Sequence, residues 1–104
     1  MKAQETFLYR LELLEKFKTK NQWKDKEHNI QKEHVAYLDS LTNEKKIIVA
    51  GITEQGLKNH EGLVILRVES YEEALTIVKN DPSVKHGMMT ADIEKFNVYF
   101  WSTE

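Results

Sequence analysis

His34 is the side chain of this sequence best suited to chemistry near neutral pH. It falls on the apolar stripe of an amphipathic segment, where an aliphatic residue would pack without needing hydrogen bonds. A histidine there either has its ring nitrogens satisfied, for example by a backbone carbonyl in the core, or faces a pocket. Because free imidazole titrates near neutrality, a ring nitrogen facing a pocket would be a natural proton shuttle. The sequence leaves both alternatives open.

Two charged residues are further candidates, and each also has a structural alternative. Arg10 can hold an anionic substrate through two parallel hydrogen bonds, or it can pair with Glu12 or Glu69 across a sheet. The ion pair is the favoured interpretation. Asp81 stands before Pro82, where its carboxylate can cap the turn that follows.

Three uncharged residues complete the set of candidate substrate-binding positions. Trp23 and Tyr37 can line a pocket wall, although aromatic residues beside an amphipathic helix more often belong to a core or an interface. Gly51 would allow a close approach of the backbone beside the pocket. The four histidines are scattered and form neither HxH nor HExxH, so no metal site is expected from this chain alone: His28, His34, His60 and His86.

Size and composition predict one compact domain, residues 1–104, in the cytosol. Cysteine is absent, and the N-terminal segment lacks the apolar centre of a signal peptide. No apolar run is long enough to span a membrane. A net charge of −2 with mixed signs argues against nucleic acid as a partner, and the lysine-rich residues 16–26 are interpreted as a solvated loop. No cofactor is expected.

The hydrophobic pattern predicts elements in the order βαββαβ, an α+β fold. Alternation marks residues 7–13 as a strand, and a 3.6-residue period marks about 25–42 as a helix with Asp25 as N-cap and Asn43 as its stop. Strands at 46–51 and 63–69 flank a loop at 52–62. Ser70 and Glu73 have capping-box spacing for a second helix that ends before Pro82.

The last strand, within residues 88–101, indicates a homodimer. Its alternating positions are apolar or aromatic on both faces: Phe96, Val98 and Phe100 on one, Ile93, Tyr99 and Trp101 on the other. Two helices cover only one face of a four-stranded sheet, so the second face needs an apolar partner. A second copy of the chain is the simplest one. The alternative is an edge strand with a few exposed aromatics.

The ordered motifs resemble those of YciI-like proteins over about residues 7–96. EHVAYL at 33–38, then Leu41 and Ala50-Gly51, resembles the pattern eHfaYL…L…aG. In the second half, GLVIL at 62–66, SYEEA at 70–74, DP at 81–82 and Gly87 match G…vl…S.eEA…DP…G. The resemblance implies a ferredoxin-like fold, a four-stranded antiparallel sheet with two helices on one face, that dimerises into an α/β barrel.

The resemblance also implies a histidine and an aspartate in a cleft, here His34 and Asp81. The family is similar in fold to muconolactone isomerases and to dehydrochlorinases of chlorinated hydroquinones. If Asp81 accepts a hydrogen bond from His34, it fixes the imidazole tautomer and stabilises the imidazolium. Lys45 replaces the usual glycine before the second strand, and Ile52 replaces a frequent proline, so the substrate class does not transfer.

Three functional hypotheses follow. The first is a small cofactor-independent lyase or isomerase, in which His34 is the general acid/base, Asp81 orients it, and His34→Ala abolishes turnover without changing the melting temperature. The second is a non-catalytic dimeric module that binds a small ligand or docks to a larger enzyme. The third is a metal site completed by a partner chain. The discriminating observation is whether His34 and Asp81 open into a solvent-connected cavity.

Overall fold

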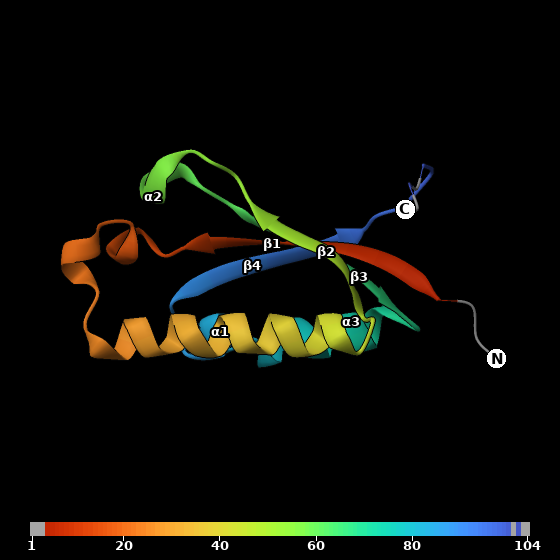
Figure 1. The fold of residues 1–104 in the computed structure, drawn as a ribbon, viewed down its shortest axis with the longest axis horizontal. Helices are drawn as coiled ribbons and strands as arrows, with labels where there is room; N and C mark the ends of the chain where they lie inside the picture. The colour runs from red at the N-terminus through yellow and green to blue at the C-terminus, as the bar shows by residue number, and fades with distance from the viewer. Residues whose placement is uncertain (1–3, 101, 103–104) are drawn as a thin grey trace.

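The computed structural model describes residues 4–100 and 102. Figure 1 shows a twisted sheet with both long helices on one side of it. The strands are β1 (Glu5–Leu13), β2 (Ile47–Ile52), β3 (Gly62–Val68) and β4 (Met89–Lys95), and the long helices are α1 (Asp25–Asn43) and α3 (Tyr71–Asn80). The strand order is β2-β3-β1-β4, and every neighbouring pair is antiparallel. The predicted ferredoxin-like βαββαβ fold is confirmed.

The core lies between the sheet and the two long helices. Alternate residues of β1 and β3 point toward the helices and are buried: Phe7, Tyr9, Leu11, Leu13, Val64, Leu66 and Val68. The helices contribute Ile30, Leu41, Ala74, Ile77 and Val78 from their apolar stripes. Strand alternation and helical periodicity thus place each buried set on the expected side.

Four short helices occupy the connections: η1 (Glu15–Phe17), η2 (Lys20–Gln22), α2 (Gly56–Asn59) and α4 (Pro82–Lys85). Helix α2 lies within the segment predicted to be a plain loop between β2 and β3, and it carries the tip of that hairpin away from the sheet (Figure 1). Among the described residues, no helix has the length and apolar character needed to cross a bilayer.

The predicted N-cap of α3, Ser70, is confirmed, whereas the predicted N-cap of α1 is wrong by one position. Helix α1 has Lys24 as its N-cap and Asp25 as its first helical residue, one position from the prediction, and the Glu27 carboxylate accepts from the Lys24 N–H at 2.8 Å. Ser70 Oγ accepts from the Glu73 N–H at 3.1 Å, as predicted. The Glu73 carboxylate, however, accepts from the backbone N–H of Glu69, not from Ser70.

The interpretation of the last strand is wrong beyond Lys95. Strand β4 ends there; the Phe96 N–H still donates to the Thr6 carbonyl at 3.1 Å, and the chain then leaves β1, which itself begins at Glu5. Phe96, Tyr99 and Phe100 follow the strand as exposed residues outside the sheet, and Trp101 lies outside the described residues. The outward positions of β4 itself are polar: Thr90, Asp92 and Glu94. The homodimer therefore stays a prediction.

Lys45 adopts a backbone conformation that favours glycine. Its φ is 65°, in the left-handed region, at the turn between α1 and β2. A side chain there is strained by about 1 kcal/mol. We expect Lys45→Gly to raise the free energy of unfolding by up to about 1 kcal/mol in urea denaturation. Lys45→Ala should give no gain, and a destabilised glycine variant would contradict the expectation.

Candidate active site

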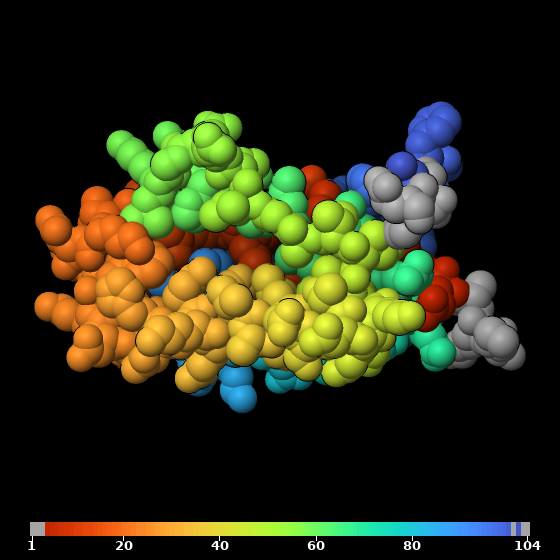
Figure 2. All heavy atoms as spheres, viewed as in Figure 1, coloured from red at the N-terminus to blue at the C-terminus, as the bar shows by residue number. Residues whose placement is uncertain are grey.

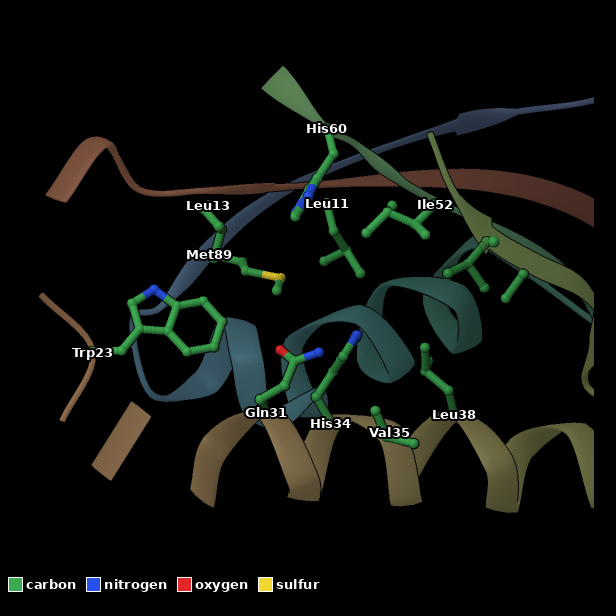
Figure 3. A pocket seen from close by; sticks show the side chains of 14 residues that line it. Leu11, Leu13, Trp23, Gln31, His34, Val35, Leu38, Ile52, His60 and Met89 are labelled. Atoms are coloured by element: carbon green, nitrogen blue, oxygen red, sulfur yellow. The ribbon is translucent and has the colours of Figure 1, made fainter. Parts of the chain in front are cut away.

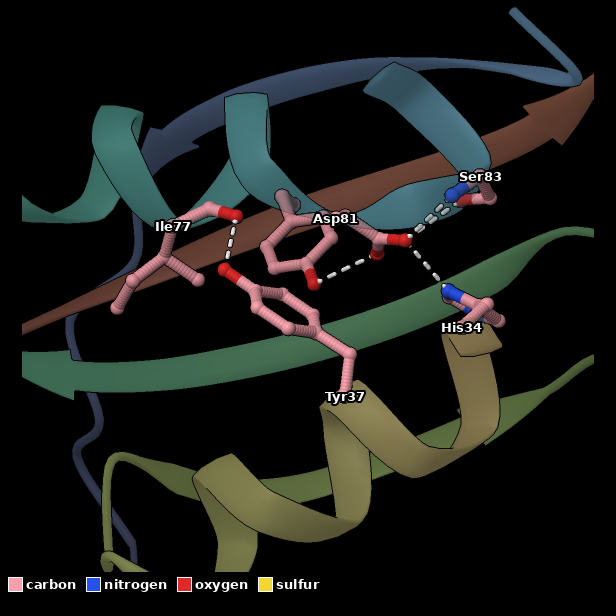
Figure 4. A network of polar contacts seen from close by, with 6 residues as sticks. His34, Tyr37, Ile77, Asp81 and Ser83 are labelled. Atoms are coloured by element: carbon pink, nitrogen blue, oxygen red, sulfur yellow. Dashed lines mark hydrogen bonds and ion pairs between the residues drawn. The ribbon is translucent and has the colours of Figure 1, made fainter. Parts of the chain in front are cut away.

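His34 and Asp81 are in direct contact although 47 residues separate them in the sequence. His34 lies on the inward face of α1, and Asp81 lies at the junction between α3 and α4, which packs beside α1 (Figure 4). The His34 Nδ1 atom is 2.7 Å from Asp81 Oδ1. Both residues are buried, with exposed fractions of 7% for His34 and 0% for Asp81.

Asp81 accepts three more hydrogen bonds. Ser83 donates its backbone N–H at 2.9 Å and its hydroxyl at 2.8 Å to Oδ1, and the Tyr9 hydroxyl donates to Oδ2 at 3.2 Å (Figure 4). Asp81 therefore makes both contacts that the sequence suggested as alternatives, since it caps α4 and also contacts His34. A carboxylate has only acceptor sites, and these four donors match that character.

The contact with Asp81 determines the tautomer of His34. Because the carboxylate accepts, Nδ1 carries the hydrogen of the neutral ring, and Nε2 keeps its lone pair. Figure 3 shows the ring directed from α1 into a cavity. The arrangement can therefore take up a proton from a molecule in that cavity and stabilise the resulting imidazolium through Asp81.

The cavity has a volume of about 280 Å³ and is bounded by α1, the helix-facing side of the sheet and the β2–α2–β3 hairpin. In Figure 2 it opens as a hollow between the helix and the hairpin, with β1 and β4 visible at its base. Its walls are mainly apolar: Leu11, Leu13, Val35, Leu38, Ile52 and Met89. Gln31, His34 and His60 add polar groups, a composition typical of small-molecule sites.

Trp23 and Gly51 line this cavity, although for Trp23 the sequence favours a place in the core or an interface. The indole ring of Trp23 also has a structural role, because its N–H donates to the Phe17 carbonyl at 2.7 Å. No protein atom approaches Gly51 closely, because a methyl group added to its Cα would meet nothing within 4 Å. That part of the prediction is wrong.

Tyr37 packs beside Asp81 instead of among the cavity-lining residues. Its hydroxyl donates to the Ile77 carbonyl at 2.7 Å. Burial and then the charge of Asp81 raise the pKa of Tyr37 to about 12. Burial first, and then the charge of Asp81 and the hydrogen bond to it, raise the pKa of Tyr9 well above its usual range. Both tyrosines thus keep their protons near neutral pH, so Tyr9 stays a donor to Asp81.

Arg10 lies on the opposite face of the sheet, away from the cavity. Its guanidinium is 2.6 Å from a Glu94 carboxylate oxygen and 3.2 Å from an Asp92 oxygen. The cross-strand ion pair favoured by the sequence is present, but its partners lie on β4 and are not Glu12 or Glu69. The structure therefore does not bring Arg10 together with His34 and Asp81.

Four residues of the site are absent from the sequence-based candidates: Tyr9, Gln31, His60 and Ser83. Ser83 follows Asp81 by two positions, the spacing at which an aspartate side chain accepts from the backbone. Gln31 precedes His34 by three, which puts both on one helix face. Tyr9 has the pattern of any inward strand residue, and His60 lies in a segment without periodicity.

Among the described residues, no three His, Asp or Glu side chains are grouped to hold a metal ion.

Comparisons with known proteins agree with this architecture. A search of curated protein sequences gives no match. Among solved structures, a 5-chloro-2-hydroxyhydroquinone dehydrochlorinase from Burkholderia phenoliruptrix AC1100, in complex with 2,5-dihydroxybenzoquinone, is similar at 24% identity and a TM-score of 0.66. The similarity covers 88% of this chain and 93% of that one, and it establishes the shared fold. The model of the YCII-related domain matches residues 10–97, so this chain belongs to the YCII-related family.

Proposed function

We propose that the protein is a small enzyme that moves a proton on a bound metabolite, with His34 as general acid/base. The observation that carries the proposal is the 2.7 Å contact between His34 and the buried Asp81, with His34 at the wall of an open cavity. Such an arrangement supplies about 10²–10⁴-fold of rate enhancement in other enzymes.

In the proposed reaction, His34 Nε2 takes a proton from an acidic C–H or O–H of the substrate. The imidazolium is stabilised by Asp81, whose own orientation is fixed by Ser83 and Tyr9. The proton then returns to another atom of the same molecule in an isomerisation, or a leaving group departs with the electron pair in an elimination. Arg10, on the far face of the sheet, has no part in this scheme.

The cavity favours a small and mostly apolar substrate. Its volume of about 280 Å³ accommodates a single substituted ring, and its walls are largely aliphatic. The structural neighbour is named as a dehydrochlorinase of a hydroxylated ring and holds 2,5-dihydroxybenzoquinone. We therefore propose a small oxygenated ring compound as the substrate class.

The alternative, a non-catalytic ligand-binding module, would be favoured by a sealed environment around both His34 and Asp81. His34 lines the open cavity, whereas Asp81 is buried behind it and does not line it. In a His–Asp pair that transfers protons, the histidine must reach the ligand, whereas the carboxylate that orients it can be shielded from solvent. This observation supports the enzyme over the module.

Proton transfer can be tested without knowledge of the full reaction. Small hydroxylated and carbonyl-bearing ring compounds are incubated with the protein in D₂O, and ¹H NMR follows the loss of C–H signals. We expect at least one compound that binds in the cavity to exchange faster with the protein than in buffer. Binding without accelerated exchange in every case would contradict the proposal and leave the binding module.

We also propose that the chain forms a homodimer through the sheet face that α1 and α3 leave open. Val49 on that face is 55% exposed, and beyond β4 Tyr99 and Phe100 are 84% and 96% exposed. Exposed large apolar side chains favour association. Sedimentation equilibrium should give twice the chain mass of 12.2 kDa, and a monomer at micromolar concentration would contradict the dimer.

A further inference from the structure

Gln31 contains a polar atom that the folded chain leaves without a partner. Its Oε1 is buried and forms no hydrogen bond, and among the described side chains no other buried nitrogen or oxygen atom lacks one. Buried polar atoms are nearly always satisfied in folded proteins, and an exception calls for a reason. Packing alone would be better served here by methionine, which has a similar length and no unsatisfied oxygen.

The position of Gln31 connects this atom with the proposed reaction. Gln31 and His34 lie one turn apart on α1, and both line the cavity. Figure 3 shows the Gln31 amide beside the His34 ring, with Trp23 and Met89 across from it. The last torsion of a glutamine side chain is soft, so the amide can turn its oxygen toward a bound molecule.

We propose that Gln31 is a specificity-determining residue that accepts a hydrogen bond from a donor group on the ligand. This inference rests on the proposed function, in which His34 Nε2 accepts a proton from the same molecule. Side chains one helical turn apart are separated by about 5–6 Å at Cβ. Two acceptors on the same face of α1, both at the wall of one cavity, select a ring with two separated donors, such as two hydroxyl groups, over a ring with one.

The test is a pair of ligands that differ in one donor: resorcinol, and its monomethyl ether 3-methoxyphenol. Affinities come from ¹H–¹⁵N NMR titrations of the full chain, with shift changes followed at cavity residues. The wild type should bind resorcinol about tenfold more tightly. Gln31→Met should bring the two affinities together by weakening resorcinol alone, because methionine retains the packing and loses the acceptor.

Two controls separate ligand recognition from folding. Gln31→Met should melt no lower than the wild type, since it removes an unsatisfied oxygen instead of a contact. Gln31→Glu keeps an acceptor oxygen and should keep the preference for resorcinol. The proposal is overturned if neither probe shifts cavity residues, if the wild type binds both equally, if Gln31→Met retains the preference, or if Gln31→Glu loses it.

The titration involves no turnover, so it fails or succeeds independently of the proposed function. Loss of the Gln31 effect would leave proton transfer by His34 untouched. Conversely, D₂O exchange that is independent of His34 would refute the acid/base role while the ligand preference set by Gln31 remained.

Discussion

Replacing His34 with glutamine is expected to lower the rate of D₂O exchange by about 10²–10⁴-fold while the protein stays folded. Glutamine retains an N–H that can donate to Asp81, so the buried carboxylate keeps its four donors. It has no group that accepts a proton near neutral pH, so the chemical step is lost. Exchange rates from ¹H NMR and melting temperatures from circular dichroism check the two parts of the expectation.

The matched control is His86→Gln, because His86 is exposed at the end of α4 and does not line the cavity. It should leave exchange unchanged, and an equal loss in both variants would contradict the assignment. His34→Ala is a poorer test than the sequence alone suggested. Alanine leaves Asp81 buried with one donor fewer, at a cost of about 1–3 kcal/mol, so its melting temperature should fall.

Replacing Asp81 with alanine is expected to lower the free energy of unfolding by about 3–5 kcal/mol. The fully buried carboxylate is the shared acceptor for His34, Tyr9 and both donors of Ser83. Its removal would leave these donors unsatisfied in the core and would remove the cap of α4. Urea denaturation followed by circular dichroism measures the loss.

A graded comparison separates this network from simple loss of volume. Tyr9→Phe removes one of the four donors and should cost only about 1 kcal/mol. Asp81→Asn keeps the volume but places an amide among donors, so its stability should lie between those of the wild type and Asp81→Ala. An Asp81→Ala variant within 1 kcal/mol of the wild type would show that the network does not stabilise the fold.

Most of the fold is predictable because each element carries its own periodicity. Alternation in β1 and the stripe of α1 specify which residues face the core, and Ser70 marks the start of α3. The end of β4 was not predictable from its own residues. Its aromatic alternation continues past Lys95, but β1 begins at Glu5, so in this register it has no strand residue opposite the positions beyond Asn97.

The site was only partly predictable, for a related reason. His34 stands out because a polar residue interrupts an apolar stripe, and Asp81 is connected with it by resemblance to a family. Tyr9 is indistinguishable from other inward residues of its strand until the contact with Asp81 is seen. His60 reaches the cavity through the placement of a hairpin, which no local pattern encodes, whereas Gln31 could have been found from its spacing of three residues from His34.

The central claim is that Asp81 holds His34 as the Nδ1–H tautomer, with Nε2 free to accept a proton from a molecule in the cavity. Long-range ¹H–¹⁵N NMR of the histidine ring at a pH where it is neutral tests this directly. We predict a protonated Nδ1 and an unprotonated Nε2 for His34. A hydrogen on Nε2 instead would contradict the account, because Asp81 would then face a lone pair and His34 would present no base to the cavity.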